Sequence, residues 1–485
     1  MMNLGLLTDY YELSMMQGYY FTNRQEEAVF DMFFRRQPFG GGFTVFAGLD
    51  PLIDAIVGLC FAAEDIDYLR SRGSFHEEFL EYLRSFRFEG NVYAMDEGSL
   101  VFPNEPLLMV RAKLLQAQLL ESMVLNFINF QSSIATKAAR IVLAAEDGAV
   151  LEFGLRRAQG VDGALSATRA AFIGGVASTS NVLAGKKFGI PVSGTMAHSW
   201  VMSFQSELEA FEKYAEIYPD NCVLLVDTFD TIKSGVPNAI KVFQKLKRVG
   251  NRDFGVRLDS GDLEYLSKAV RKMFDEAGLP EVKIYASNEL DEYIISGIKR
   301  NGAFIDAWGV GTKLVTAYDD PALTGVYKIV AKGTEGVFEP CIKISNNPEK
   351  ITNPGIKNVY RFHDGEGLML ADLVYLEDEA EVIEKLIAER KPLRFNHPSI
   401  DYVHFSPADY GTTKTMLKPV IIEGERVNGP RMLQEIQEFT RTGMHSLHPT
   451  YKRMLNPHIY KVSISDGLKR LRKRLIDECC QEGDS

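Results

Sequence analysis

From residue 149 onward, short apolar runs alternate along the chain with longer amphipathic stretches. This alternation is typical of successive β-α units around a parallel sheet. The apolar runs, which we predict to be strands, cover residues 149–153, 222–226, 255–258, 282–286, 304–310 and 325–330. The amphipathic stretches, which we predict to be helices, cover residues 162–172, 235–249, 262–277 and 289–299. The hydrophobic pattern therefore predicts an α/β fold for this part of the chain.

The residues before 149 follow a different pattern. The run at 28–34 is strand-like, and residues 91–111 alternate turn residues with β-rich runs, which suggests hairpins in a small α+β domain. Residues 114–146 are rich in Ala, Leu, Gln and Met and contain no proline, so we expect long helical segments there.

A chain of 485 residues is too long for one hydrophobic core, and we predict three regions. Residues 1–113 form an N-terminal α+β domain, and residues 331–400 return to β-like and loop-like sequence that we expect to complete it. Residues 114–330 form an α/β barrel domain. Residues 401–485 form a C-terminal extension with helices of its own.

Nearly every polar motif of the α/β region stands at the carboxyl end of a predicted strand. TIM-type barrels place their chemistry at that end, so we predict an irregular TIM-like α/β barrel. An open, doubly wound sheet shows the same alternation and is the alternative. No GxGxxG follows the first predicted strand, which weakens the dinucleotide-binding version of that alternative.

Composition and charge disfavour several classes of protein. The formal charge of −11 argues against a large nucleic-acid interface, which needs a basic surface, although it is compatible with a local basic pocket for a small anion. No apolar run approaches the length that crosses a bilayer. The five cysteines show no CxxC spacing, and the chain starts without a basic, signal-like segment. We therefore expect a cytoplasmic protein that binds neither nucleic acid nor membrane.

The candidate chemistry centres on His198 in the segment GTMAHSW, residues 194–200, which follows a short predicted strand at 190–193. Two carboxylate-bearing motifs, VDTFD at 226–230 and VRLDSGD at 256–262, end later strands. A phosphate-accepting histidine needs a carboxylate to fix its tautomer, and an anionic substrate needs an arginine nearby. A lone histidine is more often structural, but this combination of motifs predicts an enzyme site.

Three further motifs suit anionic ligands, and each also has a purely structural interpretation. One of the adjacent Arg156 and Arg157 can bind a phosphate or carboxylate, or both can form surface ion pairs. The Gly/Ser/Thr-rich segments at 174–181 and 309–313 are anion-binding sites or helix caps. Asp259 and Asp262 suit magnesium or ribose hydroxyls, or cap the helix that follows.

Eight motifs together resemble the nicotinate phosphoribosyltransferase family. They occur in the family's order from residue 6 to about 465: LLTDYYELSMMQGYY, FGLRRAQG, GTMAHSW, VDTFDT, GVRLDSGDL, SNELDE, GVGTKLVTAYDDPALTGVYK and PHIYKVS. The resemblance implies a homodimer with active sites at the subunit interface. It implies a reaction that joins nicotinate to 5-phosphoribosyl 1-diphosphate (PRPP) and forms nicotinate mononucleotide and diphosphate for NAD synthesis. It also implies Mg²⁺ as cofactor and ATP as a co-substrate, hydrolysed through a phosphorylated histidine.

The resemblance also assigns roles to individual residues. His198 corresponds to the phosphohistidine and Asp227 to its carboxylate partner. Phe153, together with Tyr11 of the other subunit, corresponds to the pair that sandwiches the pyridine ring. The remaining correspondences are Thr195 and Arg257 for nicotinate, Gly311 and Thr312 for the 5-phosphate, Arg156 and Asp259 for the ribose and diphosphate with Asp259 also at magnesium, and Ser180 in the substrate-binding loop 178–180.

Three rival functions are open to the same sequence. Relatives that use nicotinamide carry an aspartate in the loop where this chain has Ser178, Thr179 and Ser180, so the loop favours the acid. Relatives that use quinolinate lack the long C-terminal portion. A catalytically silent barrel that senses PRPP or NAD is the rival from another class, and the intact histidine, arginine and aspartate set argues against it.

Overall fold

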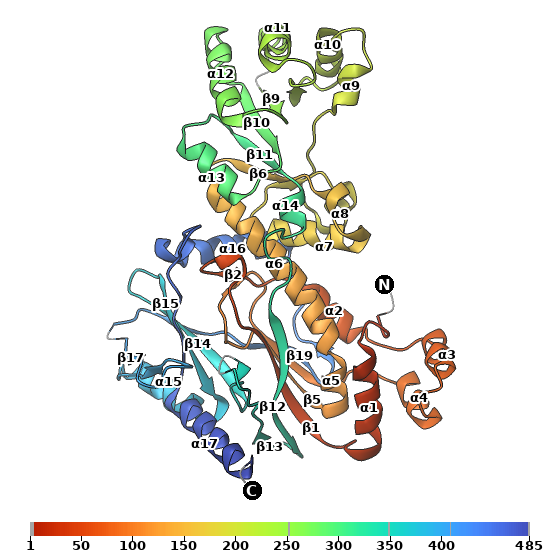
Figure 1. Ribbon diagram of the computed structural model, residues 1–485, viewed down its shortest axis with the longest axis vertical. Coiled ribbons are helices and arrows are strands. Elements are labelled where there is room, and N and C mark those ends of the chain that lie inside the picture. The colour runs from red at the N-terminus through yellow and green to blue at the C-terminus, as the bar shows by residue number, and fades with distance from the viewer. Residues whose placement is uncertain (1–3, 251–252, 348–349, 408, 484–485) are drawn as a thin grey trace. The chain divides into compact units, whose positions relative to one another are not determined.

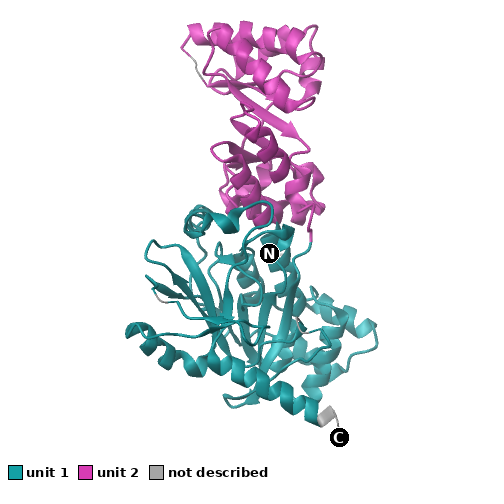
Figure 2. Cartoon of the chain, turned by 60° about the vertical axis from the view of Figure 1, so that its left-hand side comes forward, with its two compact units in different colours: residues 1–133, 322–485 teal, residues 134–321 magenta. Residues whose placement is uncertain are grey.

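The computed structural model describes residues 4–250, 253–347, 350–407 and 409–483. Residues 1–3, on which the expectation about the start of the chain partly depends, lie outside this description. The chain forms two compact units (Figure 2): unit 1 comprises residues 1–133 and 322–485, and unit 2 comprises residues 134–321. Each unit has its own sheet system.

Unit 2 is built on a six-stranded sheet in which every paired strand is parallel to its neighbour, in the order β7-β6-β11-β10-β9-β8 (Figure 1). The strands are β6 Ala149–Glu152, β7 Ser178–Thr179, β8 Cys222–Leu225, β9 Phe254–Leu258, β10 Lys283–Asn288 and β11 Ala307–Val310. Five of the six predicted strands are therefore confirmed as members of one parallel sheet.

Eight α-helices accompany the strands in the described part of unit 2, and the four predicted at 162–172, 235–249, 262–277 and 289–299 are confirmed among them. They are α7 Gly160–Ile173, α8 Val182–Phe188, α9 His198–Met202, α10 Glu207–Ile217, α11 Val236–Arg248, α12 Leu263–Glu276, α13 Glu292–Arg300 and α14 Thr312–Val315. Spacing of apolar residues explains how they pack: α11 buries Val236, Ala239, Val242, Phe243 and Leu246, which lie three or four residues apart or adjacent on one face. The ring of Phe243 stacks on Phe254 of β9 at 4.8 Å, so the helix is fixed to the sheet.

Side-chain caps determine where several of these helices begin. Asp262 accepts from the backbone N–H of Tyr265 at 3.0 Å, and Asp291 accepts from two N–H groups at the start of α13. A capping carboxylate satisfies donors that lack an intrahelical partner. Asp262 thus fills the structural role foreseen for one aspartate of the LDSGD motif, which leaves Asp259 for other chemistry.

The predicted strand at 325–330 was placed wrongly in the α/β region. It forms β12 Gly325–Thr334, which pairs antiparallel with β1 Glu27–Phe34 in unit 1. The apolar run did not show which strand it would join, because β1 lies far earlier in the chain. On the other side of β12, Glu335 and Gly336 both have positive φ, 52° and 81°, and make a tight turn into β13 Val337–Pro340, which pairs antiparallel with β12. A two-residue hairpin turn forces antiparallel pairing, whereas a parallel neighbour needs a long crossover.

Unit 1 contains two large sheets that are mainly antiparallel. The seven-stranded sheet has the order β13-β12-β1-β5-β3-β19-β20, and its further strands are β3 Asn91–Ala94, β5 Leu108–Lys113, β19 Lys418–Ile422 and β20 Glu425–Arg426. The six-stranded sheet has the order β17-β16-β21-β15-β14-β18, with strands β14 Lys357–His363, β15 Met369–Leu376, β16 Phe395–Asn396, β17 His404–Phe405, β18 Thr413–Thr415 and β21 Val462–Ile464. A two-stranded sheet joins β2 Thr44–Val45 to β4 Leu100–Val101.

The helices of unit 1 come from both ends of the chain. They are α1 Tyr10–Thr22, α2 Leu49–Val57, α3 Ala63–Ser71, α4 Glu77–Arg84, α5 Leu114–Leu119, α15 Ala380–Ala388, α16 Leu433–Ser446 and α17 Asp466–Gly483. The long helix α6 Glu121–Ala145 begins in unit 1 and ends in unit 2. None of the described helices is long and apolar enough to cross a membrane.

The boundaries of the units differ from the three predicted ranges. Residues 401–485 belong to unit 1, because β19 pairs with β3 and β21 pairs with β15. Residues 114–133 also belong to unit 1 and not to the α/β region. Pairing of strands across several hundred residues thus joins the two ends of the chain, and local sequence carries no signal for such pairing.

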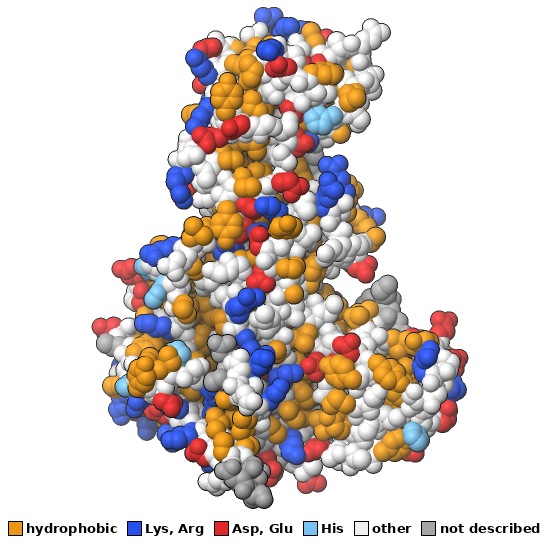
Figure 3. Space-filling view, viewed as in Figure 1, with side chains coloured by type: hydrophobic (Ala, Val, Ile, Leu, Met, Phe, Trp, Pro, Cys, Tyr) orange, Lys and Arg blue, Asp and Glu red, His pale blue; other side chains and the backbone are white. Residues whose placement is uncertain are grey.

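Two buried ion pairs lie within unit 1. The Lys357 ammonium lies 3.0 Å from Asp31, and both side chains are almost wholly buried. Arg361 donates to both oxygens of Asp372, with the shortest contact at 2.6 Å, and Tyr460 also donates to Asp372 at 2.9 Å. At the surface, by contrast, Figure 3 shows basic and acidic side chains interspersed with apolar ones on the face in view.

Candidate active site

The predicted site residues of unit 2 lie at one edge of its sheet. Phe153 follows β6, Ser180 follows β7, Asp227 lies two residues beyond β8, Asp259 follows β9 and Gly311 follows β11. Because these strands are parallel, their carboxyl ends all face the same edge (Figure 1). The expectation that the polar motifs share one edge of a parallel sheet is confirmed.

His198 stands at the first position of α9 and is half exposed. Its Nδ1 lies 3.1 Å from the hydroxyl of Thr228, and its Nε2 lies 3.8 Å from Oδ2 of Asp259. Each ring nitrogen therefore faces an oxygen. A hydroxyl can donate or accept, so Thr228 is able to fix either neutral tautomer of the imidazole.

Asp227 occupies a different place from the one expected. Its Oδ2 accepts from the backbone N–H of Asp259 at 3.0 Å and from the hydroxyl of Ser260 at 2.6 Å. The carboxylate that comes near the imidazole is Asp259. The reason is the register of β8 beside β9, which turns Asp227 toward the loop after β9. The Oδ1 atom of Asp227 is buried and has no protein hydrogen-bond partner among the described residues.

Arg257 connects the GTMAHSW segment to the sheet. Its Nη1 donates to the hydroxyl of Thr195 at 2.5 Å, and its Nη2 lies 3.7 Å from Oδ1 of Asp259. Burial lowers the pKa of Arg257, Asp259 and Asp227 act in the opposite direction, and the charge of Arg156 lowers it further. Its buried Nε has no acceptor among the described residues. The guanidinium side chain is 15% exposed, and its Nη atoms are suited to an anionic group.

Asp259 is the carboxylate that several groups share. It accepts from the hydroxyl of Ser287 on β10, faces Arg257 and His198, and remains about one-third exposed. Across the described ranges, no cluster of three or more His, Cys, Asp or Glu residues has a geometry that could hold a metal ion by itself. Magnesium is commonly bound by one or two carboxylates together with substrate phosphates and water, and Asp259 is suited to that mode.

The loops after β6 and β11 approach each other closely. A Cβ atom added to Gly309 would lie 2.7 Å from the ring of Phe153, and one added to Gly311 would lie 3.2 Å from the Phe153 carbonyl oxygen. The hydroxyl of Thr312 lies 3.4 Å from Glu289. These glycines thus allow the aromatic ring and the 311–312 backbone to sit side by side.

For three further predicted residues, the structure gives fewer contacts with the rest of the site: Arg156, Ser180 and Tyr11. Arg156 lies on an exposed 3₁₀ turn, Leu155–Arg157, near enough to Arg257 to affect its pKa. The backbone N–H of Ser180 donates to the carbonyl of Glu152 at 2.9 Å. Tyr11 lies on α1 of unit 1 with about half of its side chain exposed, so unit 2 alone does not contain it.

Sequence reasoning missed three polar residues at this edge: Thr228, Ser287 and Glu152. The first two stand inside motifs already singled out, VDTFDT and SNELDE, but nothing in a motif shows which atom a hydroxyl will contact. Glu152 immediately precedes Phe153 and is fully buried. The sequence signal that could have revealed Glu152 is an acidic residue at the end of an apolar run.

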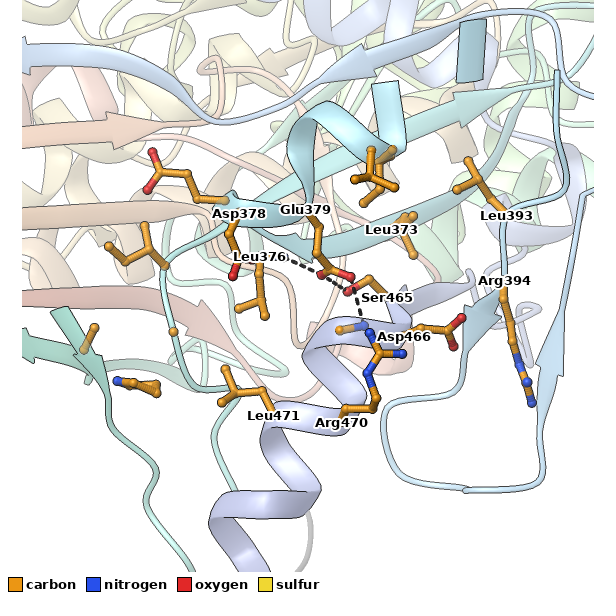
Figure 4. A pocket seen from close by; sticks show the side chains of 18 of the residues that line it. Leu373, Leu376, Asp378, Glu379, Leu393, Arg394, Ser465, Asp466, Arg470 and Leu471 are labelled. Carbon is orange, nitrogen blue, oxygen red and sulfur yellow. Dashed lines mark hydrogen bonds between the residues drawn. The ribbon is translucent and has the colours of Figure 1, made fainter. Parts of the chain in front are cut away.

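A cavity of about 1140 Å³ lies elsewhere, in unit 1. Figure 4 shows its aliphatic lining, including Leu373, Leu376 and Leu471. Its carboxylate Glu379 accepts from the hydroxyl of Ser465 and from the N–H of Gly467 at 2.9 Å, so this acid serves to cap α17. None of the predicted site residues lines this cavity. Its lining also includes three further acidic residues and four arginines: Glu377, Asp378, Asp466, Arg111, Arg394, Arg470 and Arg474. The edge of the unit 2 sheet is distinguished from it by a histidine beside an arginine and a carboxylate.

Comparison with known proteins covers nearly the whole chain. Three family models match, described as the nicotinate phosphoribosyltransferase N-terminal domain over residues 6–129, the nicotinate phosphoribosyltransferase family over 149–378 and the nicotinate phosphoribosyltransferase C-terminal domain over 356–472. The chain is 45% identical over 484 residues to a nicotinate phosphoribosyltransferase of Bacillus subtilis, which covers 98% of this chain and 96% of that protein. It is 37% identical over 526 residues to one of Caenorhabditis elegans, which covers 96% of this chain and 92% of that protein.

A solved structure shows the same fold. The human nicotinic acid phosphoribosyltransferase superimposes with a TM-score of 0.80 and 31% sequence identity, covering 97% of this chain and all of that one. The agreement extends over both units and is not limited to the sheet that carries His198. Sequence and structure together show that the chain belongs to the nicotinate phosphoribosyltransferase family.

Proposed function

We propose that the protein transfers the phosphoribosyl group of PRPP to nicotinate, forming nicotinate mononucleotide and diphosphate in NAD biosynthesis. The observation that carries this proposal is the meeting of His198, Arg257 and Asp259 at the carboxyl edge of one parallel sheet. Membership of the family supports it, because this chain matches relatives of that name over almost their whole length. The sheet is, in this proposal, part of an irregular TIM-like barrel, and unit 2 is the phosphoribosyltransferase domain.

In the transfer, the pyridine nitrogen forms a bond to C1 of the ribose while the bond from C1 to the diphosphate oxygen breaks. The pyridine nitrogen is already a nucleophile, so the protein mainly has to align it with C1. Arg257 and Thr195 are suited to hold the carboxylate of nicotinate, because a guanidinium offers parallel charge-assisted donors. Phe153 supplies one face of a slot for the flat ring. Tyr11 of a second copy supplies the other face, in a homodimer with shared sites.

The PRPP phosphates and ribose belong at the same edge, beside the residues proposed to hold nicotinate. Gly311 and Thr312 are suited to the 5-phosphate, since the glycine leaves backbone accessible beside the hydroxyl. Arg156 and Asp259 are suited to the diphosphate and the ribose, and Asp259 would also hold magnesium. Bound magnesium supplies positive charge that offsets the negative charge of the departing diphosphate.

ATP takes part in the reaction through His198. An imidazole nitrogen takes a phosphoryl group from ATP, which leaves ADP, and water later removes it as phosphate. Phosphorylation adds about −1.5 to −2 charges, enough to reorganise the charged groups around Asp259 and Arg257. Asp227 takes part by holding the Asp259–Ser260 loop in place, through the two hydrogen bonds that its Oδ2 accepts.

The substrate is the acid and not the amide in this proposal. The loop 178–180 carries hydroxyls, with Ser178 bonded to Ser193 at 2.5 Å, and no carboxylate that would repel nicotinate. Competition between nicotinate and nicotinamide at equal concentration distinguishes the two, and we expect nicotinate mononucleotide as the product.

The deciding experiment is an assay of nucleotide product from nicotinate and PRPP, with and without ATP. We expect product in both cases and a higher rate with ATP. The matched variant is His198→Ala, which should lose both the ATP stimulation and the ATP hydrolysis. An absence of product from the wild-type protein would refute the transfer, and ATP hydrolysis by His198→Ala at the wild-type rate would refute the coupling.

A further inference from the structure

Glu152 is a fully buried carboxylate behind the proposed pyridine site. It is the last residue of β6, and its side chain is 0% exposed. Phe153 follows it directly, and successive side chains near the end of a strand point to opposite sides. Glu152 therefore lies beneath the loop whose aromatic ring is proposed to contact the substrate.

The hydrogen bonds found to this carboxylate among the described residues come from neutral groups. Its Oε1 accepts from the backbone N–H of Gly154, and its Oε2 accepts from the hydroxyls of Thr168, at 3.0 Å, and Thr179, at 2.5 Å. A buried carboxylate is costly unless such donors satisfy it. Three donors on two oxygens is an arrangement that a carboxylate accepts and a carboxamide, with one acceptor oxygen, does not reproduce.

The donors come from three separate segments of unit 2. Gly154 belongs to the loop that carries Phe153 and Arg156, and Thr179 directly precedes Ser180. Thr168 lies on α7, where its hydroxyl is also 2.9 Å from the carbonyl of Ala164. Glu152 thus joins two loops of the proposed site to one helix.

Asn181 extends the same cluster to the next helix. Its N–H donates to the hydroxyl of Thr179 at 2.9 Å, and its side-chain amide donates to Thr168 at 3.3 Å. Its side-chain oxygen accepts from the N–H of Ala184 at the start of α8. A network of this kind fixes the conformation of its members as a group.

We propose that Glu152 is a positioning residue for the pyridine substrate, holding the Phe153 loop and the 178–180 loop in the mutual arrangement that fits the ring. This inference deepens the proposed function and depends on it. Glu152 acts through these loops and does not touch the substrate. Its loss should therefore weaken nicotinate binding while leaving the ATP reaction at His198, on another segment, intact.

The test compares Glu152→Ala with Glu152→Gln. We expect Glu152→Ala to raise the KM for nicotinate at least tenfold, with the KM for ATP and the extent of His198 phosphorylation within twofold of wild type. Glutamine keeps an oxygen for Gly154 and places an amide beside two hydroxyls that can turn to accept, so Glu152→Gln should recover part of the loss. Equal increases in the KM for nicotinate and for ATP, or no change in either, would overturn the proposal.

A second pair of variants guards against a Glu152→Ala protein that fails to fold. Thr168→Val removes one donor and should raise the KM for nicotinate about threefold, whereas Thr168→Ser keeps the hydroxyl and should restore it. Thr440→Val is the matched control, because Thr440 is a buried threonine of α16 in unit 1. An equal change in the KM for nicotinate in Thr168→Val and Thr440→Val would contradict the assignment.

Failure of this inference can be told apart from failure of the proposed function. Wild-type protein that forms no nicotinate mononucleotide refutes the function itself. Active wild-type protein, together with Glu152→Ala at an unchanged KM for nicotinate, refutes the positioning role alone.

Discussion

The charged groups at the carboxyl edge of the unit 2 sheet are paired less tightly than two buried ion pairs of unit 1. In unit 1, the buried Arg361 contacts Asp372 at 2.6 Å and the buried Lys357 contacts Asp31 at 3.0 Å. In unit 2, Asp259 stands 3.7 Å from Arg257 and 3.8 Å from His198, and it is about one-third exposed. Both sites contain opposite charges, yet only the sheet edge of unit 2 leaves them apart and partly open to solvent; elsewhere in unit 2, Lys137 and Arg140 form close buried pairs with Glu292 at 2.7 and 2.8 Å.

This difference separates ion pairs that stabilise the fold from charged groups that remain able to bind a ligand. A close, dry pair has little left to offer a third group, and its desolvation cost is met by the partner. A loose group that solvent reaches, such as Asp259 with Arg257 and His198, keeps bonding capacity for a substrate. The comparison predicts opposite consequences for substitutions in the two regions.

The largest effect is expected from breaking the pair in unit 1. Arg361→Met leaves Asp372 buried without its cation, and removing one partner of a buried pair costs about 3–5 kcal/mol. Urea unfolding followed by circular dichroism should show that decrease in the free energy of unfolding. The control is Arg441→Met, which breaks an exposed pair with Glu438 at 2.8 Å. Equal decreases in the two variants would remove the distinction between buried and open pairs.

The next largest effect is on catalysis and concerns unit 2. Arg257→Ala should lower kcat/KM for nicotinate about 100-fold, because losing a charged partner costs about 2–5 kcal/mol and each 1.4 kcal/mol is about tenfold. Thermal unfolding should shift far less than in Arg361→Met. A large loss of stability with little loss of kcat/KM would show that Arg257 is a structural charge after all.

A smaller effect is expected at Thr228. Thr228→Val removes the hydroxyl 3.1 Å from His198 Nδ1 and should slow phosphorylation of His198 by up to about tenfold, since a hydrogen bond between neutral groups contributes about 0.5–1.5 kcal/mol. The rate of product formation without ATP should stay near that of wild type. Thr228→Ser keeps the hydroxyl and should behave like wild type. Slower phosphorylation in the serine variant as well would point to shape, not hydrogen bonding.

The smallest effect concerns pH and Glu105 in unit 1. Burial, and then the negative charge of Asp372, raise the pKa of Glu105 well above its ordinary 4.5. Above pH 4.5 the unfolded state is ionised while the folded state keeps the proton, so this group makes stability fall as pH rises toward the folded pKa. Glu105→Gln should remove that loss, by at most about 1.4 kcal/mol per pH unit. An unfolding midpoint difference that does not grow between pH 5 and 8 would contradict this.

The sequence allowed the parallel sheet and the polar motifs at its carboxyl edge to be predicted, because each apolar run and the polar residue after it are local features. His198, Arg257 and Asp259 were recognised from their motifs in this way. The pairing of β12 with β1 was missed, since an apolar run carries no information about which strand it will join. The approach of Asp259, and not Asp227, to His198 was missed for a related reason: it depends on the register between β8 and β9.

The absence of a side chain at Gly309 leaves room for the Phe153 ring, which is proposed to form one face of the slot for the pyridine ring. One added methyl group would lie 2.7 Å from the Phe153 ring and would push that ring away from the strand. Two substitutions can therefore be combined. Gly309→Ala with Phe153→Leu would exchange side-chain volume between neighbouring strands and change the shape of the slot to fit a different heterocycle. Selectivity among flat bases would then change without altering Arg257 and Thr195, the residues proposed to bind the carboxylate.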